Sequence, residues 1–180
     1  ISPDDINAER QAGMSDDMIA QEFYCSFVVV GSRPFQFSRL HHVIDPVPVP
    51  RNAPVYMAMD WGFGAPFSVV WCWTDNDGRV YQFNEWYGWN GQPNKGLRLT
   101  DSEIARGIIE RESLMGIARR EVYRLAGPDC FQKKPDYRGG GQGPSTAETF
   151  ADHGLYLSPG DPSRELKLRQ MRERLMVPDD

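Results

Sequence analysis

Hydrophobic positions cluster in the middle of the chain, and their spacing predicts a small antiparallel sheet. Residues 55–59 are apolar or small without interruption, which is typical of a buried central strand. Apolar and β-prone positions at 67–73 and 79–86 predict two further strands. The intervening Asn76-Asp77-Gly78 is a strong hairpin signal. We therefore expect a meander of three strands.

Beyond residue 100 the pattern alternates between helix and strand. Thr100-Asp101-Ser102-Glu103 matches a capping box, and apolar positions spaced for one helical face predict a helix over about 101–115. A strand follows at 120–126, and we expect it to be parallel to a strand of the meander because a helix separates them. The remaining elements expected are a glycine-rich loop, a helix, a brief strand and a charged helix, at 132–144, 145–153, 155–157 and 163–176. This order predicts an α/β fold with a mixed sheet flanked by helices.

The N-terminal part of the chain has a different pattern. Capping signals predict two short helices within 2–27, and the β-prone residues 24–31 follow them. Prolines then recur without periodicity at positions 34, 46, 48, 50 and 54. We therefore divide the chain into a helical appendage at 1–31, a proline-rich linker at 32–54 and one domain at 55–180. The pair His41-His42 falls in the linker and is expected to be solvated.

Composition and charge argue against several classes of protein. No apolar run approaches the ~20 residues that a membrane span requires. Cys25, Cys72 and Cys130 lie far apart, which argues against a zinc site or a disulfide framework. The net charge is −5, but the first 27 residues hold six acidic residues and one basic residue, whereas residues 119–174 are mildly basic. This distribution is compatible with a phosphate-binding face in the second half of the chain.

Two carboxylates carry the candidate chemistry. Asp60 directly follows the first predicted strand, and Asp129 follows the strand at 120–126. If these two strands are neighbours, both carboxylates converge at one edge of the sheet, where a divalent cation is the simplest way to accommodate them. Mg²⁺ or Mn²⁺ bound there would serve phosphodiester hydrolysis. The loop bases Lys133, Lys134 and Arg138 are then expected to contact the nucleic-acid backbone.

Aromatic residues are frequent in and after the predicted meander. They are expected to pack first of all, with a base-stacking platform as the alternative: Trp71, Trp73, Tyr81, Phe83, Trp86, Tyr87 and Trp89.

Several segments together resemble one protein family. They are a Q-E-(aromatic)-x-C-x-F pattern at 21–27, the run VYMAMDWGFGAPFSVVWCW, a glycine-aromatic run at Gly78–Glu85, the GPDC at 127–130, and the stretch from STAETF to RERL at 145–175. In these features the chain resembles the C-terminal half of the large terminase subunit of tailed bacteriophages and prophages. The nuclease domain of that family has an RNase H-like fold.

The resemblance implies a function and a setting. Asp60 and Asp129 would bind the metal of an endonuclease that cuts concatemeric DNA during packaging, and Glu85 would assist. Residues 1–31 would end the ATPase domain, and the partners would be double-stranded DNA, that ATPase domain, the small terminase subunit and the portal, in the cytoplasm of the bacterial host. The family's further aspartate comes from a C-terminal helix, which we expect beyond Asp180. Walker motifs are absent from this sequence, so it is not expected to hydrolyse ATP by itself.

Two other functions remain open from the sequence. An actin-like or sugar-kinase phosphotransferase also places an acid after a first strand, but it requires a second glycine-rich phosphate loop that we do not find. A non-catalytic RNase H-like domain that docks DNA or the portal would leave the acids without metal.

Overall fold

The computed structural model describes residues 6–7, 37–135 and 140–176. It divides the chain into two compact units, of which one is Pro46–Pro162 and the other contains the remaining residues. The elements predicted within 2–31 lie outside the described residues, except for residues 6–7, which are helical. Arg138 and Cys25 also lie outside them. No helix among the described residues is long and apolar enough to cross a membrane.

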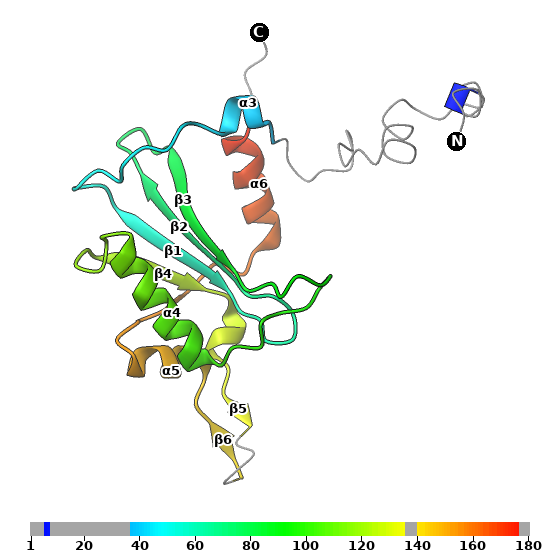
Figure 1. Cartoon of the computed structure of the whole chain (residues 1–180), viewed down its shortest axis with the longest axis vertical. Helices are drawn as coiled ribbons and strands as arrows, with labels where there is room; N and C mark the ends of the chain where they lie inside the picture. Colours follow the sequence, from blue (N-terminus) through cyan, green and yellow to red (C-terminus); the bar gives the residue numbers. More distant parts are fainter. Residues whose placement is uncertain (1–5, 8–36, 136–139, 177–180) are drawn as a thin grey trace. The chain divides into compact units, whose positions relative to one another are not determined.

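A mixed sheet forms the centre of the larger unit (Figure 1). Its five strands lie in the order β3-β2-β1-β4-β7. β1 pairs antiparallel with β2 and parallel with β4, β2 pairs antiparallel with β3, and β4 pairs parallel with β7. The strands are β1 (Val55–Asp60), β2 (Ser68–Thr74), β3 (Val80–Tyr87), β4 (Val122–Ala126) and β7 (Ser158–Pro159). The predicted meander is confirmed, and so is the prediction that the fourth strand is parallel to a strand of the meander, which is β1.

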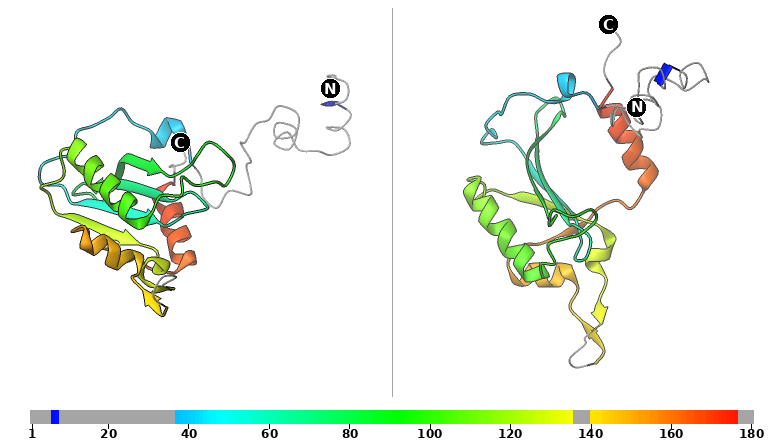
Figure 2. Two further views of the ribbon diagram at one scale, coloured as in Figure 1. Left: turned by 60° about the horizontal axis from the view of Figure 1, so that its bottom comes forward. Right: turned by 45° about the vertical axis from the view of Figure 1, so that its right-hand side comes forward.

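Alternation along the strands directs one face of this sheet toward two helices. In β1 the side chains of Val55, Met57 and Met59 are buried, whereas Ala58 and Asp60 between and after them are exposed. The buried face packs against α4 (Asp101–Leu114) and α5 (Thr146–Asp152), which lie on the same side of the sheet (Figure 2). The hydrophobic core of this unit therefore lies between the sheet and these helices.

Both helices begin at capping boxes. The Thr100 hydroxyl accepts a hydrogen bond from the Glu103 backbone N–H, and the Glu103 carboxylate accepts one from the Thr100 N–H. Ser145 and Glu148 repeat this arrangement at the start of α5. Each box satisfies N–H groups that have no partner within the helix, which fixes the first residue of the helix. The predicted starts of both helices are confirmed.

A buried ion pair joins α4 to β4. The guanidinium of Arg124 lies 2.5 Å from the carboxylate of Glu112, and their side chains are only 16% and 4% exposed. The indole nitrogen of Trp71 donates to the same carboxylate at 3.3 Å. A carboxylate this deeply buried requires such partners, because an isolated charge is strongly destabilising in the core.

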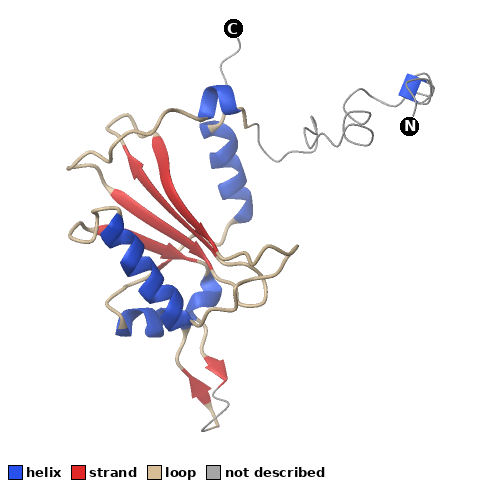
Figure 3. Cartoon of the chain, in the orientation of Figure 1, coloured by secondary structure: helices blue, strands red, loops and turns tan. Residues whose placement is uncertain are grey.

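The structure corrects several sequence predictions. The loop predicted at 132–144 contains a two-stranded ribbon of β5 (Lys134–Pro135) and β6 (Gln142–Gly143), separate from the main sheet (Figure 3). The brief strand lies at β7 rather than at 155–157, because Leu155 packs into the core while the ladder with β4 starts at Ser158. The predicted linker contains a short helix, α3 (Arg39–His42). Its last histidine is not simply solvated, since its Nδ1 accepts a hydrogen bond from the Ser38 N–H.

The aromatic residues do not all pack as expected. Trp71 and Trp73 are buried, and Tyr81, Phe83 and Trp86 are partly buried against the core. Tyr87 and Trp89, in contrast, are 55% and 49% exposed, so the prediction that they pack is wrong.

The smaller unit contains α6 (Arg164–Arg174), which confirms the charged helix predicted at 163–176. The Ser163 hydroxyl caps it by accepting a hydrogen bond from the Leu166 N–H. None of its residues is buried.

Candidate metal and nucleic-acid site

The parallel pairing of β1 with β4 brings the carboxyl ends of both strands to one edge of the sheet. Asp60 is the last residue of β1, and Gly127 directly follows β4 beside it, with its N–H bonded to the Met59 carbonyl at 3.3 Å. A short 3-10 helix, η1 (Pro128–Phe131), then begins and carries Asp129. The sheet order therefore places both predicted acids at the same edge.

Gly127 lies close to both carboxylates. A Cβ atom at this position would lie 2.6 Å from Oδ1 of Asp129 and 3.9 Å from Oδ1 of Asp60. Both carboxylates thus border the small space that the missing side chain leaves open. Both residues are exposed, and neither carboxylate has a hydrogen bond or an ion pair among the described residues. The structure brings these two predicted residues together, and within the part of the chain that it describes their charges have no partner.

This pair has the properties of a site for a hard divalent cation. Mg²⁺ and Mn²⁺ bind carboxylate oxygens and usually retain several waters, with one or two carboxylates from the protein. Two exposed, unpaired carboxylates beside a glycine fit that description. Among the residues that the structure describes, no group of three or more His, Cys, Asp or Glu side chains could hold a metal. A cation here would therefore take most of its ligands from water and substrate.

A third carboxylate in this region, that of Asp101, has a different role. Asp101 is the first residue of α4 and accepts hydrogen bonds from the Trp61 indole at 2.8 Å, the Lys134 ammonium at 2.7 Å and the Thr146 hydroxyl at 3.0 Å. The Lys134 ammonium also lies 4.3 Å from the centre of the Trp61 ring. Asp101 therefore ties together the loop after β1, the β5–β6 ribbon and the start of α5. Sequence reasoning identified Asp101 only as part of a helix start, because nothing local indicates these distant partners.

The negative charge at this edge of the sheet affects the pKa of the Cys130 thiol. Its thiol is buried directly after Asp129. Burial raises its pKa to about 12, and the carboxylates of Asp129, Asp101 and Asp60 add to the effect, while Lys134 opposes it. A buried thiol with a raised pKa is expected to be neutral at physiological pH and a poor nucleophile.

The other predicted site residues that the structure describes are Glu85, Lys133 and Lys134. Glu85 pairs with Val70 in β2, which in turn pairs with Ala58, so two strand spacings of about 4.8 Å each separate it from β1. Its carboxylate accepts a hydrogen bond from Gln82. Lys133 forms an exposed ion pair with Glu148 at 2.5 Å, and Lys134 is bound to Asp101. The structure thus brings Lys134, but not Glu85, close to the acidic edge.

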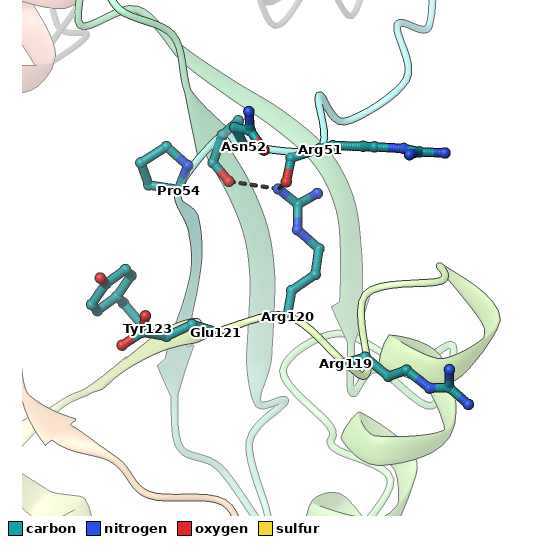
Figure 4. Close-up of a pocket in the computed structure, with 8 residues that line it drawn as sticks. Arg51, Asn52, Pro54, Arg119, Arg120, Glu121 and Tyr123 are labelled. Carbon is teal, nitrogen blue, oxygen red and sulfur yellow. Dashed lines mark hydrogen bonds between the residues drawn. The ribbon is translucent and has the colours of Figure 1, made fainter.

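A separate basic hollow lies at the opposite end of β1 and β4 (Figure 4). It is lined by residues that include Arg51, Arg119, Arg120 and Tyr123. Arg120 donates to the carbonyls of Pro50, Arg51 and Ala53, at 2.7, 2.9 and 2.6 Å. This guanidinium fixes the approach to β1 against the start of β4, so its role is structural.

Comparison with known proteins shows a likeness in structure. No model of a known protein family matches this sequence, and no curated protein matches it. The nuclease domain of the P22 large terminase aligns with a TM-score of 0.57 at 20% identity, over 81% of this chain and 69% of that domain. The large terminase of a thermophilic bacteriophage aligns with a TM-score of 0.55 at 17% identity, over 77% of this chain and 30% of that protein. Its complex with ADP gives 0.58 at 14% identity, over 97% of this chain and 40% of that protein.

These similarities establish the fold. The chain has the mixed sheet of the terminase nuclease domains, and the expected RNase H-like architecture is confirmed. The chain spans about a third of the length of the large terminase from the thermophilic phage.

Proposed function

We propose that this chain is the nuclease domain of a phage DNA-packaging terminase, a metal-dependent endonuclease that hydrolyses phosphodiester bonds of concatemeric viral DNA. The observation that carries the proposal is the convergence of Asp60 and Asp129 on Gly127, with neither carboxylate paired among the described residues. Unpaired acids at the carboxyl edge of a sheet indicate a cation-binding function rather than a structural one. The fold shared with terminase nuclease domains supports this assignment.

The chain's own residues would bind and orient the components of the reaction. Asp60 and Asp129 would hold Mg²⁺ or Mn²⁺. When bound, such ions supply an activated water and stabilise the leaving oxygen, two of them acting together in two-metal enzymes. Lys133, Lys134 and Arg138 would contact the DNA backbone, whereas Glu85, two strands away from β1, would stand outside the metal site. Since Lys133 and Lys134 are paired with Glu148 and Asp101, DNA phosphates would compete with these carboxylates for the ammonium groups.

The same proposal implies which partners the chain has and where the reaction takes place. The partners would be double-stranded DNA, the terminase ATPase domain, which residues 1–31 would complete, the small terminase subunit and the portal. Residues 32–54 would link the ATPase domain to the nuclease domain at 55–180. The reaction would take place in the cytoplasm of the bacterial host.

One observation favours a second candidate, a non-catalytic domain that docks DNA or the portal. The part of the chain that the structure describes offers two acids at the edge, and no third His, Cys, Asp or Glu completes a metal-binding group. Such a domain would retain the fold, and Lys133 and Lys134 at the β5–β6 ribbon, without binding metal.

Thermal unfolding with and without divalent cations separates the two candidates. A cation at 100 times its dissociation constant stabilises the folded state by about 2.7 kcal/mol. We expect Mn²⁺ and Mg²⁺ to raise the melting temperature of the chain, and Asp60→Asn or Asp129→Asn to abolish the rise. Asp152→Asn, a change of an exposed acid at the end of α5, is the matched control and should retain it. Equal responses of all four proteins would favour the docking domain.

A further inference from the structure

Two loops meet beside the candidate metal site and fix each other's conformation. Residues 61–67 follow β1, and residues 88–100 follow β3, and they lie side by side at the same end of the sheet (Figures 1 and 2). The Gly96 N–H donates to the Gly64 carbonyl at 2.7 Å, and Gly96 forms a β-bridge with Trp89. A Cβ at Gly96 would collide with the Ala65 carbonyl and lie 2.7 Å from that of Phe63. The backbones of Phe63 and Trp89 therefore both adjoin Gly96.

Large apolar side chains project from these fixed loops. Phe63 is 45% exposed, Trp89 49% and Leu97 42%. The Trp89 indole nitrogen donates to the Gln92 carbonyl at 2.6 Å, which constrains the orientation of the ring. Neither Phe63 nor Trp89 stacks on another ring or on a cation within the described part of the chain. Two aromatic rings that are nearly half exposed on adjoining loops, one of them held by a hydrogen bond, indicate a surface that binds a ligand.

The charge of the second loop indicates what it binds. Residues 88–100 contain Lys95 and Arg98 and no acidic residue. Both basic side chains are exposed, and neither has a hydrogen bond or ion pair among the described residues. A protein-binding surface is typically depleted in lysine. Aromatic rings interspersed with basic side chains are instead typical of surfaces that stack nucleobases and neutralise phosphates.

We propose that Phe63 and Trp89 form a binding site for unstacked nucleobases, with Lys95 and Arg98 neutralising the adjoining phosphates. This inference rests on the proposed nuclease function, because it assigns the site to the same edge that carries Asp60. It specifies the substrate as DNA whose bases are unpaired next to the scissile bond. Stacking tolerates any base, so the site selects unpaired DNA without reading its sequence.

Binding of short oligonucleotides without divalent metal tests this inference independently of cleavage. A dye-labelled single strand is titrated with the full chain in EDTA, and its anisotropy and the tryptophan fluorescence are recorded together. Because stacking contributes about 1–3 kcal/mol per base, Trp89→Ala and Phe63→Ala should weaken single-strand binding by roughly 5- to 150-fold. The affinity for a blunt duplex of the same sequence should change much less.

Two further substitutions serve as controls: a conservative change of Trp89 and a change of an exposed ring outside the two loops. Trp89→Phe should restore single-strand affinity while removing most of the tryptophan quenching, which excludes misfolding as the cause of the loss in Trp89→Ala. Tyr156→Ala removes a ring that is 74% exposed outside these loops and should bind like the wild type. Equal losses for single strand and duplex, or unchanged single-strand binding by Trp89→Ala, would overturn the inference.

The same titration distinguishes this inference from the proposed function. Asp129→Asn should bind the single strand as the wild type does in EDTA. If metal fails to stabilise the chain while binding through Trp89 persists, the nuclease proposal fails and the base site stands. If metal stabilises the chain while Trp89 proves irrelevant to binding, the base site fails alone.

Discussion

At the scale of single residues, Asp60 and Asp129 are the candidate metal ligands that the sequence indicates most clearly. An acid at or shortly after the end of a predicted strand is a local signal: Asp60 directly follows the run at 55–59, and Asp129 follows the strand at 120–126 after two residues. The contacts of Asp101 with Trp61 and Lys134 have no local signal, because their partners are 40 and 33 residues away. The same is true of Gly127, whose importance depends on which side chains converge on it. Sequence reasoning therefore identifies candidate metal ligands but not the residues that position them.

Substitution of Gly127 tests whether the space beside it is the metal position. Gly127→Ala would place a Cβ 2.6 Å from Oδ1 of Asp129, so that carboxylate must move, while the backbone φ of −60° suits alanine. We expect about tenfold weaker Mn²⁺ binding by calorimetry, as is common when the support of a metal ligand changes. The melting temperature without metal should not fall, since no backbone atom obstructs the new methyl group.

Gly64→Ala is the control for this substitution, because a Cβ at Gly64 meets no atom within 4 Å. It should bind Mn²⁺ like the wild type. Unchanged Mn²⁺ affinity in Gly127→Ala would show that the space beside Gly127 is not the metal position.

At the scale of elements, local signals predict long elements well and short ones poorly. The capping boxes at Thr100 and Ser145 locate the starts of α4 and α5, because a cap is made within four residues. β5, β6 and β7 contain two residues each, and their position is set by the strand they pair with. The shift of β7 from 155–157 to Ser158–Pro159 is an example, since its register comes from β4.

The contribution to stability of the ion pair between Glu112 of α4 and Arg124 of β4 can be tested by substitution. Glu112→Gln would leave the largely buried Arg124 guanidinium without its charge partner, and breaking a buried pair in this way typically costs about 3–5 kcal/mol. Urea unfolding should show a correspondingly lower midpoint. Glu173→Gln breaks an exposed pair with Arg169, 3.7 Å apart, and should leave the midpoint unchanged. A loss no greater for Glu112→Gln than for Glu173→Gln would mean that this pair does not stabilise the domain.

At the scale of the whole molecule, strand order is the feature that gives the site its position. The helix between β3 and β4 predicted a parallel fourth strand, and the pairing of β4 with β1 brings Asp60 and Asp129 to one edge. The sequence could not show that the loops after β1 and β3 also meet at that edge, because their contact depends on the completed sheet. The proposed metal site and the proposed base site are therefore both consequences of one topology.

Nicking of supercoiled plasmid tests the central claim most directly. The chain is incubated with plasmid in Mn²⁺, in Mg²⁺ and in EDTA, beside Asp60→Asn, Asp129→Asn and the control Asp152→Asn. We expect metal-dependent nicking by the wild type and by Asp152→Asn, and none by Asp60→Asn or Asp129→Asn. Nicking that persists in Asp60→Asn and Asp129→Asn, or a wild-type chain that binds Mn²⁺ and DNA but never nicks, would contradict it.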